Sequence, residues 1–329
     1  MQHLSPEEIW NIPQNHLLRL LEQGVLIQKP SEIHFYAPSF IRYGTSNFHP
    51  SRKDFLTISI TGRSCALRCK HCNGKILGTM HSATTPKELY SLCSKFKFEG
   101  AKGCLISGGC LPDGSVPLDR FIEVIKRIKL ELGLTIFAHV GIISYEKARL
   151  LREAGVDAAL IDIIGDDETI KEIYNLNLTI RDYENSLDAL SRSGIAFVPH
   201  VIAGLHYGRL KGEFTALKMI AGYNPSAIVI IAFMPIRGTE MFGVKPPEPL
   251  EIARVLAVAR VMFPNKPLVL GCMRPKGKHR AETDVLAIKA GVNAIAFPAE
   301  EAIKYAEEHG YVVRFSTFCC SQVYKDFMA

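Results

Sequence analysis

The sequence predicts an α/β fold, a (β/α)8 TIM-type barrel with an N-terminal helical extension and a short cysteine-bearing C-terminal tail. Three observations predict it: short apolar runs of strand length, amphipathic stretches between them, and a span of roughly 250 residues for about eight such units. Runs of this kind are typical of parallel strands that are buried on both faces. The predicted strands are residues 55–61, 104–107, 134–140, 157–163, 195–202, 227–233, 267–271 and 293–297.

Amphipathic stretches separate these strands and predict the helices of the barrel. Their apolar residues recur at i, i+3 and i+4, and several of the stretches end in glycine, a common helix stop. The stretch near 214–222 has the weakest pattern. A doubly wound open sheet is the alternative fold. The predicted helices are residues 87–98, 118–132, 145–155, 183–194, 214–222, 249–262, 281–291 and 300–310.

The chain divides into three predicted parts. Residues 1–50 are expected to form an N-terminal helix and an aromatic strap, residues 51–300 the barrel, and residues 301–329 a tail that covers the barrel mouth. The first helix is expected to begin after Ser5, just before a proline, and to end at Gly24. In a barrel, chemistry takes place at the carboxyl ends of the strands.

Composition excludes several classes of protein. The 329 residues carry a net charge of +6 and are 47% hydrophobic, which suits a globular protein with a large core. No apolar run approaches the roughly 20 residues that a bilayer span needs, and the amino terminus lacks the pattern of a secretory signal. The basic stretch at 276–280 favours a solvated loop over a nucleic-acid patch. We therefore expect a cytoplasmic protein that binds neither membranes nor nucleic acids.

Cysteine usage points to metal or redox chemistry. The chain has nine cysteines, an odd number, and no export signal, so a disulfide framework is not expected. Cys65, Cys69 and Cys72 follow the first predicted strand with the spacing C-x3-C-x2-C. Three thiolates on one loop can ligate three irons of a cubane and leave the fourth iron open for a small molecule. A zinc site would need a fourth protein ligand, which His71 could supply.

This cysteine loop resembles that of the radical S-adenosylmethionine (SAM) superfamily. The resemblance implies a [4Fe–4S] cluster whose open iron chelates SAM, and reductive cleavage of SAM to methionine and a 5′-deoxyadenosyl radical. It also implies that His71, at a position that is commonly Phe or Tyr in the family, contacts the adenine.

Later strand ends resemble biotin synthase and its relatives. Ser107, Gly108 and Gly109 resemble the glycine motif that binds the SAM amino group, although a plain turn explains them equally well. The resemblance implies that Asp162 and Arg181 line the SAM pocket, with the arginine fork on the SAM carboxylate; a solvated helix-end arginine is the alternative. Gly204 falls in a stretch that resembles the adenine-binding strand of this group.

Six cysteines lie outside the loop. Cys93 and Cys104 are interpreted as packing residues. The hypothesis for the others is an auxiliary Fe–S cluster over the barrel mouth, with unrelated buried or surface thiols as the alternative. Its candidate ligands are Cys110, Cys272, Cys319 and Cys320, with Ser321 as a weaker substitute.

A radical generator with a second cluster suggests sulfur insertion at an unactivated C–H bond. The strap and the tail resemble biotin-synthase homologues that form one half of a two-protein lipoyl synthase. The resemblance implies an octanoylated lipoyl-carrier protein or peptide as substrate, a second radical SAM subunit as partner, and an electron donor such as ferredoxin. Another radical SAM reaction and a non-catalytic Fe–S protein are the alternatives. No general acid or base is expected, and His139, His200 and His206, near strand ends, are interpreted as structural.

Overall fold

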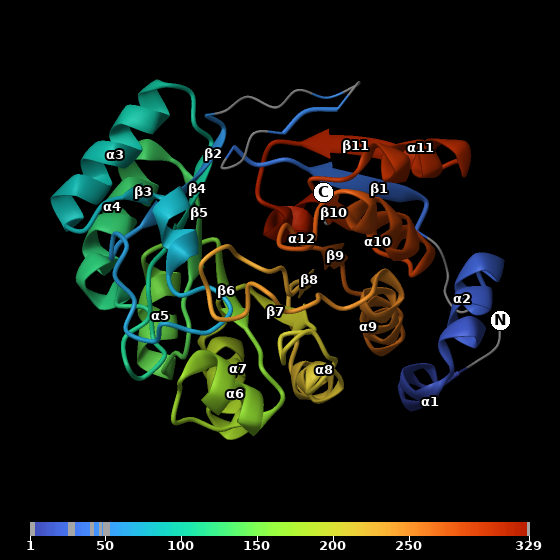
Figure 1. Cartoon of the computed structure of the whole chain (residues 1–329). Helices are drawn as coiled ribbons and strands as arrows, with labels where there is room; N and C mark the ends of the chain where they lie inside the picture. Colours follow the sequence, from blue (N-terminus) through green and yellow to red (C-terminus); the bar gives the residue numbers. More distant parts are fainter. Residues whose placement is uncertain (1–3, 26–29, 40–42, 46–47, 49–52, 328–329) are drawn as a thin grey trace.

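The computed structural model describes residues 4–25, 30–39, 43–45, 48 and 53–327 (Figure 1). They form one curled parallel sheet of eleven strands with helices around its outer face. The strand order is β11-β1-β10-β9-β8-β7-β6-β5-β4-β2-β3. The strands are β1 (Glu32–Tyr36), β2 (Phe55–Ser59), β3 (His81–Ser82), β4 (Gly103–Ser107), β5 (Thr135–His139), β6 (Ala158–Asp162), β7 (Phe197–Ala203), β8 (Ile228–Ala232), β9 (Leu268–Leu270), β10 (Ala294–Ala296) and β11 (Val312–Ser316).

The eight predicted barrel strands are present in the predicted order, as β2 and β4 to β10. Most of their residues are buried, which explains why the apolar runs identify them. The expected direct closure of the barrel differs, because β10 pairs with β1 rather than with β2. The Ser39 N–H instead donates to the Phe55 carbonyl at 3.2 Å, so the segment after β1 bridges to β2.

Part of the predicted irregular strap is a regular strand. β1 lies between β10 and β11 and pairs in parallel with both. Four of its five residues are buried. The aromatic sequence EIHFY therefore extends the sheet, and the rest of the strap falls partly outside the described residues.

The expected N-terminal helix is two helices, α1 (Pro6–Asn11) and α2 (Gln14–Gln23). Pro13 separates them: Ile12 has the extended backbone (φ −63°, ψ 149°) that a residue before proline favours. A capping box at Ser5 opens α1, and Gly24, with φ +64°, ends α2 as expected.

The outer helices follow the predicted alternation (Figure 1). The helix α6 was not predicted; an Asp166 cap begins it, and Asn175 with φ +54° ends it. The helices are α3 (Pro86–Phe98), α4 (Ile122–Leu132), α5 (Tyr145–Glu153), α6 (Asp167–Tyr174), α7 (Ile180–Ser193), α8 (Glu213–Ala221), α9 (Pro249–Met262), α10 (Lys278–Lys289), α11 (Glu300–Glu308) and α12 (Val323–Asp326), with 3-10 turns η1 (Lys75–Thr79), η2 (Leu118–Phe121) and η3 (Cys320–Gln322).

The C-terminal tail packs against apolar side chains from the strands. Its anchors lie at residues that precede strands: the Thr317 hydroxyl donates to Asp54, and Tyr324 and Lys325 donate to Asp157. These positions are at the opposite ends of β2 and β6 from the edge where the cysteine loop begins. That the tail covers the mouth stays a prediction.

Candidate cofactor site

The cysteine loop begins directly after β2 and is held by its own backbone. The Cys72 and Asn73 N–H groups both donate to the Cys69 carbonyl, at 3.2 and 2.8 Å. Asn73 and Gly74 have positive φ, +45° and +67°, which turns the chain sharply after the third cysteine. The loop is thus a tight turn that brings the Cys69 and Cys72 thiols close together.

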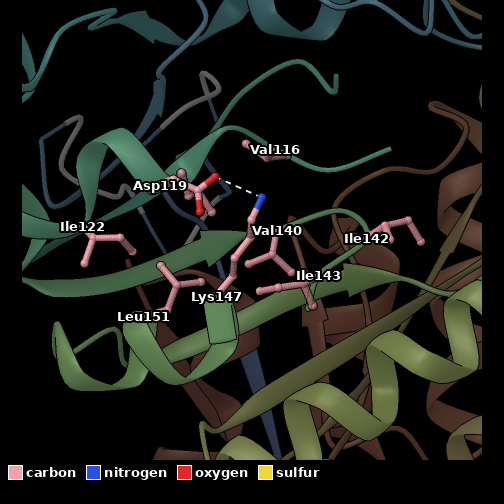
Figure 2. Close-up of a pocket in the computed structure, with 9 residues that line it drawn as sticks. Val116, Asp119, Ile122, Val140, Ile142, Ile143, Lys147 and Leu151 are labelled. Atoms are coloured by element: carbon pink, nitrogen blue, oxygen red, sulfur yellow. Dashed lines mark ion pairs between the residues drawn. The ribbon is translucent and has the colours of Figure 1, made fainter. Parts of the chain in front are cut away.

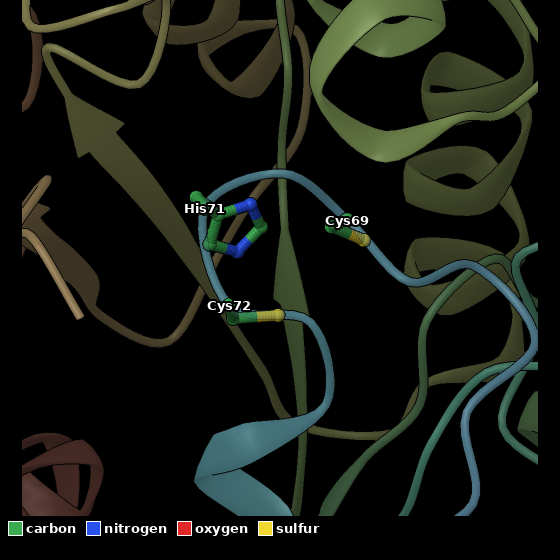
Figure 3. A group of neighbouring side chains, drawn as sticks. All are labelled: Cys69, His71 and Cys72. Carbon is green, nitrogen blue, oxygen red and sulfur yellow. The ribbon is translucent and has the colours of Figure 1, made fainter. Parts of the chain in front are cut away.

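His71 faces the same space as two of these thiols. Its ring nitrogen and the sulfurs of Cys69 and Cys72 lie within 4.8 Å of one another (Figure 3). The Nδ1 of His71 is buried without a hydrogen-bond partner among the described residues, as is the Tyr174 hydroxyl, and the two rings are 5.1 Å apart. Two orphaned polar atoms beside a thiol cluster indicate that a ligand belongs here.

A fourth cysteine, Cys110, interacts with the thiols of the loop. Its hydrogen bond to Cys65 lowers the pKa of the Cys65 thiol to about 5. The hydrogen bond from Cys69 lowers the pKa of Cys72 to about 4, and the same contact and burial raise the pKa of Cys69. Two sulfurs are therefore thiolates at neutral pH, the form that binds metal.

The glycine motif after β4 packs on the cysteine loop. A Cβ at Gly109 would lie 2.0 Å from the Ser64 carbonyl oxygen and 2.6 Å from the Cys65 Cα. The Gly109 N–H donates to the Thr61 hydroxyl at 2.7 Å, and the Cys110 carbonyl accepts from the Ala66 N–H. Only glycine fits at this position, because two backbones meet there.

A second polar group lies on the next three strands. His139 and Asp162 end β5 and β6, and His200 lies at the middle of β7; their ligand atoms lie within 4.8 Å of one another. Burial raises the pKa of Asp162, but His139, followed by His200 and His71, lowers it overall, and the charge of Asp162 acts on the Cys110 thiol of the glycine motif. The group therefore adjoins the cysteine loop at the carboxyl ends of the strands.

Residues 59–208 match the sequence pattern of the Radical SAM superfamily. This segment is a radical SAM domain. It contains the whole cysteine loop, the glycine motif and the polar group on β5 to β7.

Curated relatives place the chain near biotin synthases. Biotin synthase of Zymomonas mobilis is 26% identical over 260 residues, covering 76% of this chain and 74% of the relative. Biotin synthase of Neorickettsia sennetsu is 30% identical over 185 residues, covering 55% and 54%. The chain thus contains a segment that matches the Radical SAM superfamily, and it has biotin synthase-like homologues.

Solved structures share the fold of the whole chain. HydG, a maturase of the [FeFe]-hydrogenase, matches with a TM-score of 0.65 at 16% identity, covering 100% of this chain and 75% of that one. Methylornithine synthase matches with a TM-score of 0.64 at 16% identity, covering 98% and 94%. At this identity they show the fold alone.

Two predicted SAM-pocket residues have other surroundings. Arg181 is exposed at the start of α7 and makes no ion pair or side-chain hydrogen bond within the described part of the chain. The Gly204 N–H donates to Glu213 at 2.8 Å, and a Cβ there would lie 2.5 Å from the Pro247 ring. Their roles in binding SAM stay predictions.

The four candidate auxiliary ligands do not gather at one point. Cys110 hydrogen-bonds with Cys65 of the radical SAM loop. Cys272, Cys319 and Cys320 form a separate neighbourhood, because their charges act on one another's pKa values. Burial raises the pKa of Cys272 to about 11, whereas the Cys320 contact lowers that of Cys319 to about 7.

Two hollows lie away from the radical SAM loop. One, of about 10 Å³, holds the 2.9 Å ion pair of Lys147 with Asp119 (Figure 2), and it has room for about one water. A larger one, of about 860 Å³, lies between α2 and α10 and includes Lys278 and Arg280 of the basic stretch. Neither contains a cysteine of the loop.

The sequence interpretation missed the grouping of His139 with His200. The available signal was position: each lies two residues beyond an inward-facing apolar residue, Phe137 or Val198, on a predicted strand. Among the described residues, no helix is both long and apolar enough to span a bilayer.

Proposed function

We propose that this radical SAM protein inserts sulfur into an octanoyl chain on a lipoyl-carrier protein or peptide, as one subunit of a two-protein lipoyl synthase. The observation that carries the radical part is the crowding of Cys65, Cys69, Cys72 and Cys110 around one turn. The hydrogen bond to Cys72 and burial, followed by the charges of the neighbouring thiols, raise the pKa of Cys69, and bound iron ions would take the place of its proton. The donor set therefore fits an iron–sulfur cluster.

The chain's own residues would hold and position the reactants. Cys65, Cys69 and Cys72 would ligate the cluster, and the two orphaned atoms, His71 Nδ1 and the Tyr174 hydroxyl, would hydrogen-bond SAM. With SAM bound, such a cluster supplies the 5′-deoxyadenosyl radical that takes a hydrogen atom from the substrate. The protein's task is to orient the target carbon and exclude water.

The sulfur source in this proposal is an auxiliary cluster near Cys272, Cys319 and Cys320. All three lie near the core of apolar strand residues, and Cys319 and Cys320 are buried. The Ser321 hydroxyl is also buried without a partner among the described residues. Cys110 is better placed with the first cluster, because it contacts Cys65.

An anaerobic assay tests the proposal. The reconstituted full chain is incubated with SAM, a reductant such as ferredoxin or dithionite, and an octanoylated carrier peptide. We expect 5′-deoxyadenosine and, by mass, a peptide that has gained one sulfur. The variant C72A should lose both products, whereas C93A, which alters a buried cysteine of α3, should keep them.

The outcomes separate the competing functions. 5′-Deoxyadenosine without sulfur gain would indicate another radical SAM reaction on this scaffold. Absence of 5′-deoxyadenosine, with one zinc per chain and little iron, would indicate that His71 completes a zinc site with the cysteines. Iron bound without SAM cleavage would indicate a non-catalytic Fe–S protein.

A further inference from the structure

The polar group on β5, β6 and β7 has the geometry of a metal site. His139 and Asp162 are the last residues of β5 and β6, and His200 lies opposite Asp162 in the β6–β7 register. They follow Phe137, Leu160 and Val198 by two positions, so they continue the face that lines the inner apolar cluster. Three neighbouring strands thus aim three ligands at one point.

The donor atoms of the three side chains lie close together. The His139 Nε2 pairs with the Asp162 Oδ1 at 3.5 Å. The two imidazole rings have centroids 5.9 Å apart at 53°, too tilted to stack. One nitrogen from each histidine and one carboxylate oxygen still lie within 4.8 Å of one another. A cation at their centre would be within reach of all three donors at once.

The orientation of His200 is independent support. Its Nδ1 lies 3.1 Å from the Val198 carbonyl, which accepts a hydrogen bond from the Nδ1–H and leaves Nε2 with the free lone pair. A hydrogen bond from the second ring nitrogen to a backbone carbonyl is the usual way in which proteins orient a metal-binding histidine.

We propose that His139, Asp162 and His200 bind one divalent transition-metal ion inside the barrel, in addition to any Fe–S cluster. Two imidazoles with one carboxylate suit Fe²⁺, Zn²⁺ or Co²⁺ and do not suit the all-oxygen preferences of Mg²⁺ or Ca²⁺. Three protein ligands leave coordination positions open. The inference does not depend on the proposed sulfur insertion.

The test uses Co²⁺ as a spectroscopic probe of the full-length chain in which C65A, C69A and C72A remove the radical SAM loop thiols. The chelator-treated protein is titrated with Co²⁺ and followed by elemental analysis and visible absorption. We expect one Co²⁺ per chain, with d–d bands and without the near-ultraviolet band of a cobalt–thiolate bond. H139A, H200A and D162N should each weaken binding at least about 100-fold, more than the 10- to 100-fold cost of losing an outer-shell partner.

Two control variants test whether Co²⁺ binds to His139, Asp162 and His200 rather than to neighbouring side chains. H206A changes a nearby histidine that bonds to Thr169 and should leave Co²⁺ affinity unchanged. A C272A/C319A/C320A variant should also keep the ion, because no thiol belongs to the proposed site. Loss of binding in that variant, with a thiolate band in its parent, would overturn the proposal.

A measurement without triad substitutions covers the case in which those variants do not fold. Paramagnetically shifted NMR signals of two exchangeable imidazole N–H protons should appear on adding Co²⁺ to the parent protein. Absence of Co²⁺ uptake, or uptake with no shifted imidazole signal, would overturn the proposal.

Discussion

Two acid–base pairs lie near the carboxyl ends of the same sheet, and they differ in how completely they are satisfied. Arg274 and Asp284 are fully buried and meet through two bonds, at 2.7 and 2.8 Å. The remaining N–H groups of Arg274 donate to carbonyls after β9 and in and after β10, and Asp284 also accepts from the Ala299 N–H. His139 and Asp162 pair through a single contact, at 3.5 Å.

The difference distinguishes a structural tie from a site. An arginine whose donors are all used has no capacity left for a ligand, and it joins β9, β10 and α10. In the His139, Asp162 and His200 group, one ligand atom from each side chain lies within 4.8 Å of the others. Three donors that converge with only one 3.5 Å pair among them, rather than charge or burial alone, distinguish a candidate site from a tie.

We expect the largest loss of stability when the buried Arg274–Asp284 pair is broken. R274M should lower the free energy of unfolding by about 3–5 kcal/mol, because it leaves Asp284 buried without its partner. Chemical denaturation of the metal-free protein measures this. R127M, which breaks the exposed Arg127–Glu131 pair of α4, should hardly move the midpoint. Equal losses in the two variants would refute the comparison.

A pH-dependent effect is expected at Glu213, a buried carboxyl with one partner. Burial raises its pKa to about 7; Oε1 accepts from the Gly204 N–H, and Oε2 has no partner among the described residues. Between the ordinary carboxyl pKa and about 7, the folded protein holds a proton that the unfolded chain has lost. Stability should therefore fall as pH rises through this window.

The E213Q substitution should remove the loss of stability that the parent protein shows as pH rises. At pH 5 the variant and the parent should unfold at similar denaturant concentrations. At pH 8 the variant should be more stable by about 2–3 kcal/mol, the scale of a shift of this size. The exposed E301Q change on α11 should show no such divergence. A variant that is less stable by the same amount at both pH values would show that Glu213 stays ionised.

The sequence carried most of the fold, because periodicity reports burial. Both faces of the barrel strands are covered, so their apolar runs were visible along the chain. The direct closure of the barrel was not predictable in the same way. β1 reads as an aromatic strap, and only its pairing with β10 and β11 shows that it is a strand. The break between α1 and α2 was readable from Pro13 and was overlooked.

The candidate site also has features that the sequence predicts and features that only the structure shows. The spacing of Cys65, Cys69 and Cys72 is local, so the loop could be recognised without a structure. Contacts between distant residues were not accessible: nothing in the spacing places Cys110 against Cys65 rather than beside Cys319. Likewise, His139 and His200 are 61 positions apart, and only the curled sheet brings their rings together.

We expect the smallest change in the free energy of unfolding at the His139, Asp162 and His200 group. H200L replaces a neutral ring that makes one hydrogen bond, at 3.1 Å to the Val198 carbonyl. Losing that bond costs about 1 kcal/mol, and the added apolar burial of leucine offsets it, so the free energy of unfolding should change by less than about 1 kcal/mol. Denaturation of metal-free protein, alongside R274M, makes the contrast direct. A loss of more than about 2 kcal/mol in the free energy of unfolding would mean that His200 supports the strands. The His139, Asp162 and His200 group would then be a structural contact like the Arg274–Asp284 pair.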